Sequence, residues 1–487
     1  MRYYIPVFAV LGGVVMLFAL ALLVPVGFAL VGGDAGLAAM LQALAVTLAS
    51  GAVLYLGLRR RGPRRELQPR DGFLLVALVW AVLPAFGALP LMLHLPDLSF
   101  TDAYFEAVSG LTTTGATVLT GLDALPTSVN VWRCFMVLVG GMGILVLAVA
   151  ILPLLGVGGS QVFKAETPGP MKDQKLTPRI AETARGLWLV YFGIAAACCV
   201  AFRIAGMGWA DAFMHMCSVM GLGGFAAYDA SFGHFDSVAI EAVAIFFMTL
   251  AGVNFALYFL AWRRRSLRGV FTDLEARMYL GVLAAGVLGV ALFLTAHEVY
   301  PSFWTALRHA AFSVVSIATT TGFATVDYAQ WPMFAPVLML FLCCFATSAG
   351  STGGGIKMIR AVLLLKQARN ELKRIVHPRA VAPVTLGGSI VPPQVLQSVL
   401  AFMLIYGVAL TCGTLLLLAS GLDAVTAFTA IVACINNTGP GLGQVGPAAN
   451  YQGLTDFQTW VCTITMLLGR LELLSVLVLF TPQFWRR

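Results

Sequence analysis

The chain has 487 residues, of which 59% are hydrophobic before its 50 glycines are counted, and only 11% are charged. Soluble proteins contain about 45 to 50% apolar residues with glycine included, so this composition excludes a set of water-facing domains and indicates an integral membrane protein. The net charge of +8 does not indicate a nucleic-acid partner, because the basic residues gather in short runs between apolar segments, as orientation in a bilayer requires.

Apolar windows of about 20 residues, the length that crosses a bilayer core, predict ten spanning helices. The first is expected to be a span because its apolar run is longer than the core of a signal peptide. The predicted spans are residues 4–31, 36–58, 72–94, 131–155, 185–205, 238–261, 276–297, 333–368, 394–419 and 457–481.

Four further apolar stretches contain only about a dozen residues each, too few to cross the bilayer. They lie between the third and fourth, fifth and sixth, seventh and eighth, and ninth and tenth spans. We predict that each is a re-entrant half-helix, which enters and leaves the membrane on one side.

Basic clusters set the orientation of the spans. All of them fall on one side of the ten-span arrangement, which predicts cytoplasmic N- and C-termini and half-helices that enter from outside. The clusters are Arg59, Arg60, Arg61, Arg64, Arg65 and Arg70; residues 164–185; Arg263, Arg264, Arg265 and Arg268; Lys366, Arg369, Lys373, Arg374 and Arg379; and Arg486 and Arg487.

An internal repeat aligns the ends of the four half-helices. The strings TTTGAT, GLGGFA, TTTGFA and NNTGPG share Gly115, Gly224, Gly322 and Gly439, and an alanine stands twelve residues before each glycine. The repeat predicts a division into an N-terminal helix pair with its basic loop (1–70) and four repeats (71–160, 161–270, 271–380 and 381–487). A single copy of such a string would more often be a simple turn, but four aligned copies disfavour that alternative.

Four such units around one axis predict a cation-selective pore. Each half-helix directs its partially negative C-terminus inward, and the extended segment after it can offer backbone carbonyls that replace the hydration shell of a cation. The expected filter residues are Thr113, Thr114, Gly115, Leu222, Gly223, Gly224, Thr320, Thr321, Gly322, Asn437, Thr438 and Gly439. Beyond the filter, Asp229 and Asp327 are expected either to add negative potential at the mouth or to be loop residues.

A glycine-rich segment, FATSAGSTGGGIKMIR, interrupts the eighth predicted span, and its glycines should unwind a helix there. It lacks the spacing of a phosphate-binding loop, so we expect this chain itself to bind no nucleotide. We predict an intramembrane gating loop below the filter, with a close helix-packing face as the alternative. The expected gate residues are Ala349, Gly350, Gly353, Gly354, Gly355, Lys357 and Arg470.

Arg470 lies too deep in the last predicted span to reach the membrane surface, so it should face the pore or a partner group. We expect its guanidinium to bond carbonyls of the gating loop and to repel cations. The alternatives are a salt bridge with Glu472, which a separation of two residues on a helix disfavours, and a salt bridge with an acidic residue on another helix.

The chain resembles the Trk, Ktr and plant HKT superfamily of potassium transporters, and most closely its bacterial TrkH-type subunits. The strings that carry the resemblance include SGLTTTGATVLTGLD, ETPGPMKDQKLTPRIAETARGLW, SIATTTGFATVDYAQWP and MLLGRLELLSVLVLF. It implies an all-α membrane fold, a homodimer in the bacterial inner membrane, potassium as the transported ion, and a cytosolic nucleotide-binding regulator of the TrkA kind. The second and fourth strings, GLGG and NNTG, depart from TTTG, so selectivity for potassium over sodium is expected to be weaker than in a channel with four identical filters.

The expected function is gated potassium uptake, with a proton-coupled potassium symporter as the alternative. Coupling would need a titratable acid within a span, and Glu241 and Glu472 are the candidates. An enzyme is disfavoured, since His215, His309 and Asp211 fall in different repeats or lack catalytic spacing. The nine cysteines show no metal-binding spacing either.

Overall fold

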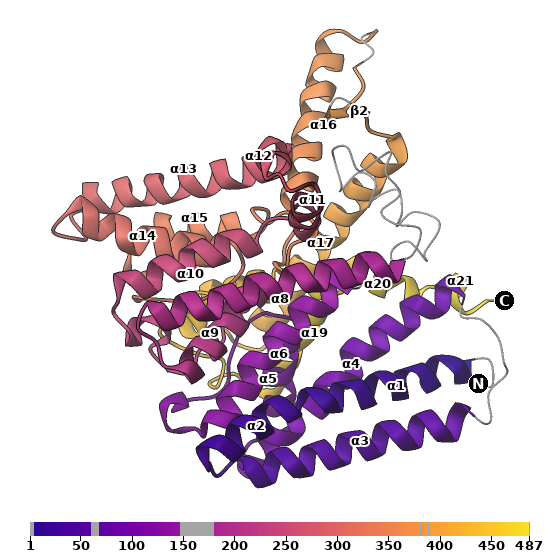
Figure 1. The fold of residues 1–487 in the computed structure, drawn as a ribbon. Coiled ribbons are helices and arrows are strands. Elements are labelled where there is room, and N and C mark those ends of the chain that lie inside the picture. The colour runs from indigo at the N-terminus through magenta and orange to yellow at the C-terminus, as the bar shows by residue number, and fades with distance from the viewer. Residues whose placement is uncertain (1–3, 60–67, 147–179, 380–381, 388, 487) are drawn as a thin grey trace.

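The computed structural model describes residues 4–59, 68–146, 180–379, 382–387 and 389–486. These residues form a helical bundle in which α1, α3, α8 and α13 run in roughly the same direction, and both ends of the chain lie at the same end of the bundle (Figure 1). The strands β1 (Thr385–Leu386) and β2 (Ser389–Ile390) pair as one short antiparallel hairpin, in which Thr385 faces Ile390.

The N-terminal helix pair consists of α1 (Ile5–Ala21), α2 (Leu23–Gly32) and α3 (Leu37–Arg59). Because Leu22 keeps helical backbone angles, α1 and α2 together form one candidate span of 28 residues. Helix α3 lies alongside α1 (Figure 1). A side chain at Gly12 or Gly51 would collide with the opposite helix, so these two glycines allow the close approach.

Four successive units follow, each with a long helix, a short helix that ends inside the bundle, and a second helix. The units are α4 (Pro69–His94), α5 (Phe100–Leu111) and α6 (Thr127–Val146); α8 (Ile180–Ile204), α9 (Trp209–Gly221), α10 (Val238–Ala251) and α11 (Phe255–Arg264); α13 (Leu274–Ala296), α14 (Phe303–Ala318), α15 (Phe334–Cys343) and α16 (Met358–Val376); and α17 (Pro393–Ala419), α18 (Ala424–Ile435), α19 (Asp456–Arg470) and α20 (Leu473–Leu477).

Short elements connect or end these units. They are α12 (Arg268–Thr272) and α21 (Pro482–Trp485), together with the 3₁₀ turns η2 (Leu122–Ala124), η6 (Ser231–His234), η7 (Tyr328–Gln330), η8 (Gly443–Val445) and η9 (Val478–Phe480). Helix α16 and the β-hairpin project away from the bundle (Figure 1).

Side-chain caps define where three of the four short helices begin. The side chains of Ser99, Ser302 and Asp423 accept hydrogen bonds from the first-turn N–H groups of α5, α14 and α18. Helix α9 begins instead after Gly208, without a side-chain cap. Such caps satisfy N–H groups that have no partner within the helix, which fixes where α5, α14 and α18 begin.

Within the described residues, three predicted spans are not continuous helices. The sixth (238–261) bends by 88° between α10 and α11, where Asn254 starts the new helix by accepting a hydrogen bond from Ala256. The eighth (333–368) is broken between α15 and α16, as its glycines indicated. The tenth (457–481) ends its long helix at Arg470, and Glu472 has a left-handed φ of 51°.

Six described helices, or seven with the bent pair, are long and apolar enough to cross a membrane. Part of the fourth predicted span (147–155) and the basic residues at 60–65 and 164–179 lie outside the described residues.

Candidate ion pathway

The four short helices end in the same backbone turn. In each unit, the N–H of the residue before the shared glycine donates to the carbonyl five residues earlier. The preceding residue has a left-handed φ. This conformation lets the turn pair carbonyl groups left free at the helix end, and it redirects the chain. The hydrogen bonds are Thr114 to Ser109 (2.8 Å), Gly223 to Ser218 (3.0 Å), Thr321 to Ser316 (2.8 Å) and Thr438 to Ala433 (2.8 Å), and the φ angles are 54° at Thr113, 55° at Leu222, 61° at Thr320 and 55° at Asn437.

The shared glycines pack the four turns into a closed ring. A Cβ atom on Gly115 would meet the carbonyl oxygen of Gly223, and one on Gly224 would meet that of Thr321. The same holds for Gly322 against Thr438 and for Gly439 against Thr114, so the contacts run from the first unit to the fourth and return to the first. All four glycines have positive φ and line one cavity of about 80 Å³. The structure thus brings the twelve expected filter residues together.

The side chains of the ring are less uniform than its backbone. In the first and third units, which face each other across the ring, hydroxyl pairs join Thr112 to Thr114 and Thr319 to Thr321 at 2.7 Å. In the fourth, the Asn437 amide donates to the Thr114 hydroxyl at 3.0 Å. The second unit has Leu222 between two glycines, so it offers no side-chain hydrogen bond at these positions.

A buried ion pair lies beside the ring, and the sequence analysis did not predict it; its Arg133 lines the same cavity as the shared glycines. Arg133 on α6 lies 2.7 Å from Glu106 on α5, and both side chains are fully buried. Glu106 accepts a hydrogen bond from the N–H of Val118, while Arg133 donates to the carbonyl of Ala226. The pair therefore joins the segments that follow the first and second filter turns. Its sequence signal is two charged residues in apolar segments, a pattern typical of functional or paired groups.

The two aspartates beyond the filter have structural partners. Asp229 lines the cavity and accepts hydrogen bonds from the N–H groups of Gly121 and Leu122 at 2.8 and 3.1 Å. Asp327 caps η7 by accepting from Ala329. Of the two roles left open for them, loop support is the one that these contacts show.

The glycine-rich segment lies against the ends of the half-helices. The Thr352 hydroxyl donates to the carbonyl of Met220, at the end of α9. The N–H of Gly354 donates to the Thr320 hydroxyl at 2.9 Å, and a Cβ on Gly354 would collide with the carbonyl of Asn436. The segment is therefore an unwound loop that contacts the second, third and fourth units, and its residues Ser351 and Thr352 are buried.

Arg470 completes these contacts toward the first unit. Its guanidinium donates to the carbonyl of Thr352 at 3.0 Å and to that of Gly140 on α6 at 3.4 Å, and the side chain is only 2% exposed. Glu472 pairs instead with Arg360 at 3.1 Å. In the described part of the chain no carboxylate lies within ion-pair distance of Arg470, so neither salt-bridge alternative is observed.

Two residues that sequence reasoning missed hold the loop in place. Buried Glu275 on α13 accepts hydrogen bonds from the N–H groups of Ala349 and Ile359, at 2.8 and 3.2 Å, and so clamps both ends of the loop. Gly350 has a φ of 74° and packs against the Asn254 side chain. Lys357 donates to the carbonyl of Gly353 within the loop.

The candidate residues for proton coupling or catalysis are dispersed. Glu241 forms an ion pair with Arg308 at 2.7 Å, and Glu472 is 43% exposed beside Arg360. His215 is buried, with its Nδ1 atom 2.8 Å from the carbonyl of Asp211. Among the described residues no group of three His, Cys, Asp or Glu side chains could hold a metal ion.

Comparison with known proteins assigns the family. Residues 36–487 match the family model TrkH, described as a cation transport protein. The chain is 46% identical over 478 residues to the Trk system potassium uptake protein TrkH of Salmonella typhimurium, and 45% identical over 482 residues to that of Halomonas elongata, with 98% of each chain covered.

A solved structure has the same fold. The crystal structure of the potassium transporter TrkH from Vibrio parahaemolyticus superimposes with a TM-score of 0.91 at 42% identity, over 99% of this chain and all of that one. The expected all-α membrane fold is therefore confirmed. The relatives of this chain are transporters, which confirms the expectation that the chain is not an enzyme. The chain belongs to the TrkH family of cation transport proteins.

Proposed function

We propose that the chain takes up potassium ions across the inner membrane through the ring of four filter turns. The observation that carries the proposal is the closed order of contacts, in which each shared glycine lies against a carbonyl oxygen of the next unit. A ring of backbone carbonyls can replace the water around a cation. Two relatives, at 46% and 45% identity, are named potassium uptake proteins.

The loop below the ring is the proposed gate. It contacts the ends of three half-helices, and Arg470 extends its contacts to the first unit. These contacts support the proposal that an ion leaving the filter meets this loop. A buried guanidinium there opposes cations electrostatically. Opening would require the loop and Arg470 to separate from each other or from the ring.

We propose further that the chain acts as a homodimer with a cytosolic nucleotide-binding regulator of the TrkA kind. Helix α16 supports this part, because it follows the loop directly and projects from the bundle (Figure 1). It exposes Leu365, Leu372 and Ile375 beside basic Lys373 and Arg374. A partner bound to this helix would act on the loop through Met358, where the helix begins.

Proton-coupled symport remains the second candidate function. The arginine partners of Glu241 and Glu472 favour a structural role for both acids. We therefore propose that potassium flows passively through the filter, without proton coupling.

Cation flux into liposomes that hold the purified protein tests the function. Potassium, rubidium, sodium and lithium would be compared with and without an imposed pH gradient. We expect potassium and rubidium flux to exceed that of sodium and lithium and to be unaffected by the gradient. Flux that required the gradient would support symport, and flux without preference among the four ions would contradict the filter assignment.

Replacing Arg470 tests the gate. Arg470→Ala removes both carbonyl contacts and the buried charge, so we expect the flux to rise severalfold without a change in ion preference. Arg203→Ala, at the exposed end of α8, is the matched control. An unchanged flux in a folded Arg470→Ala variant would remove Arg470 from the gate.

A further inference from the structure

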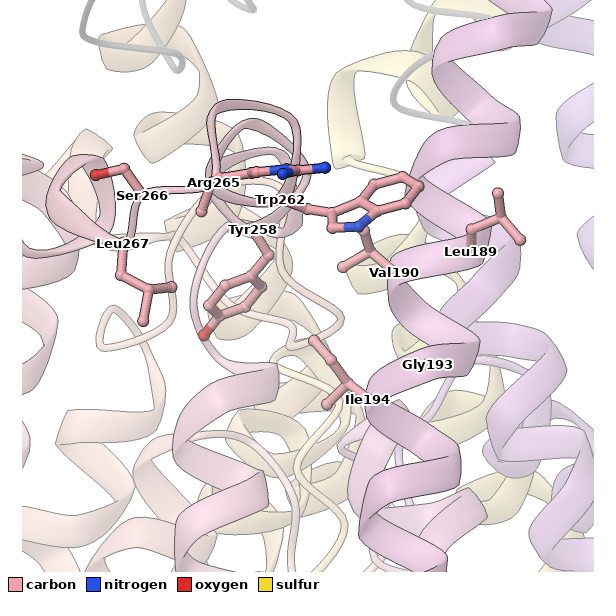
Figure 2. A pocket seen from close by; sticks show the side chains of 10 residues that line it. Leu189, Val190, Gly193, Ile194, Tyr258, Trp262, Arg265, Ser266 and Leu267 are labelled. Atoms are coloured by element: carbon pink, nitrogen blue, oxygen red, sulfur yellow. The ribbon is translucent and has the colours of Figure 1, made fainter.

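An apolar groove of about 440 Å³ lies between α8 and the segment from α11 to α12. Figure 2 shows its lining: Val190 and Ile194 on α8 face Tyr258 and Trp262 on α11. Arg265 lies where α11 stops, and in this view its guanidinium extends toward the side on which Trp262 lies (Figure 2). The groove is thus apolar along its length and cationic at one end.

The residues at this end have the character of a membrane interface. Trp262 is 62% exposed, and Arg263, Arg265 and Arg268 are exposed around it. Tryptophan favours the level of the lipid headgroups, and clustered arginines next to a span attract anionic lipids. From these residues we expect the arginine end of the groove at headgroup level and its apolar part in the hydrocarbon layer.

We propose that the groove binds one anionic phospholipid, with an acyl chain between α8 and α11 and the phosphate beside Arg265. The shape and the charge order match this ligand: an apolar slot for the chain and a guanidinium for the phosphate, which guanidinium groups bind with charge-assisted hydrogen bonds. A zwitterionic lipid would fill the same slot but gain less from the arginines.

A second copy of the chain fits this face less well. A twofold interface places the same patch of each copy against the other. Here it would bring two clusters of exposed arginines together, and such like-charge contacts oppose association. An anionic lipid neutralises the cluster instead.

A short series of hydrogen bonds links the groove to the loop below the filter. The Tyr258 hydroxyl, in the groove wall, donates to the carbonyl of Leu250 at 2.8 Å, across the 88° bend. At the same bend the N–H of Phe255 donates to the carbonyl of Gly350, and the N–H of Ser348 donates to that of Gly252. A lipid that stabilises the bend thereby stabilises the anchoring of the loop. This regulatory part rests on the proposed gate, whereas lipid binding does not.

Lipid binding is tested on the purified full-length protein by native mass spectrometry with phosphatidylglycerol and phosphatidylcholine. Gly193 lies in the groove, and a Cβ there would meet no atom within 4 Å, so Gly193→Trp fills the groove without a backbone clash. Gly289→Trp is the matched control, since Gly289 is an exposed glycine of α13 with the same open surroundings.

We expect Gly193→Trp to lose one tightly retained phosphatidylglycerol and Gly289→Trp to retain it. Arg265→Gln should weaken phosphatidylglycerol binding about fivefold, the effect of one surface charge, and leave phosphatidylcholine binding unchanged. Equal retention in the two tryptophan variants would overturn the proposal. So would a loss of dimer in Gly193→Trp with lipid retention unchanged, which would assign the groove to a second copy.

Flux into liposomes of each composition then tests the link to the gate. We expect phosphatidylglycerol to change potassium flux at least twofold in the wild type and in Gly289→Trp, and to have no effect in Gly193→Trp. Lipid retention without this difference would refute the link alone. If no variant conducts any cation, the proposed function fails while the retention result still decides the lipid site.

Discussion

The filter ring and the loop below it are adjacent, yet they are stabilised in opposite ways. In the ring, one backbone hydrogen bond and one glycine contact occur four times, so the geometry does not depend on which side chain is present. The loop occurs once, and it is held by side chains from three different places: Glu275 on α13, Thr320 in the third filter turn and Arg470 on α19. Repetition suits a site that must keep one shape, whereas unlike single contacts suit a segment that must change shape.

Removing the buried ion pair of Arg133 and Glu106 is expected to have the largest effect, because this support of the ring depends on side chains and not on the repeated backbone. Arg133→Met leaves the Glu106 carboxylate buried without its partner, and we expect the free energy of unfolding to fall by about 3 to 5 kcal/mol. Thermal unfolding in detergent measures the loss. Arg203→Met is the control, and Glu106→Leu combined with Arg133→Met should recover part of the stability. An unaltered melting temperature in Arg133→Met would mean that the backbone alone holds the ring.

Removing the clamp on the loop is expected to have the next largest effect. Glu275→Ala removes hydrogen bonds to a charged acceptor, which typically contribute about 1.5 to 3 kcal/mol, so the closed loop should be destabilised and basal potassium flux should rise. Glu275→Gln keeps one oxygen for the N–H groups of Ala349 and Ile359 and should show a smaller rise. Equal flux in both variants and the wild type would contradict the assignment of Glu275 to the loop.

A single methyl group tests whether the ring depends on its glycines. Gly115→Ala places a Cβ against the carbonyl of Gly223 at a φ of 82°. Left-handed backbone costs an alanine about 1 to 2 kcal/mol at either glycine, and at Gly115 the collision with the carbonyl adds to this cost. We therefore expect potassium flux to fall clearly further in Gly115→Ala than in Gly121→Ala. Gly121→Ala is the control, since Gly121 also has positive φ but has open space around it. A similar loss in both would show that strain alone, without the ring contact, lowers the flux.

The smallest expected effect concerns the entry to the fourth half-helix. The backbone N–H of Thr426 bonds the Asp423 carboxylate and lowers its pKa. The stability that the ionised Asp423 cap contributes is therefore complete above the unfolded pKa of about 3.9. It is lost as the pH falls through the lower pKa of the folded state. Asp423→Ala should cost at most about 1 kcal/mol at pH 7. Melting temperatures of variant and wild type should converge at low pH, and a constant difference would contradict the cap.

The sequence predicted the ring better than its surroundings, for a physical reason. The half-helices and filter turns repeat, so four weak signals at Gly115, Gly224, Gly322 and Gly439 reinforce one another. The order of contacts around the ring was not predictable, because it depends on how distant units pack. The interruption of the eighth span was predictable from its own glycines.

Features that depend on one long-range partner were missed. Glu106 and Arg133 lie 27 positions apart, and nothing local indicates that they meet. The bend after α10 was not predicted because residues 238–261 are mostly apolar, and the new helix begins at the single cap Asn254. The partner of Glu472 proved to be Arg360, on a helix 112 positions away.

Placing four unequal units in one polypeptide has an evolutionary consequence. In an assembly of four identical subunits, one codon change alters all four filter turns at once. Here a mutation reaches a quarter of the ring, and the left-handed backbone position that holds threonine in two units holds Leu222 and Asn437 in the others. Ion preference in this lineage can therefore drift in small steps, one unit at a time, while the shared backbone keeps the pathway intact.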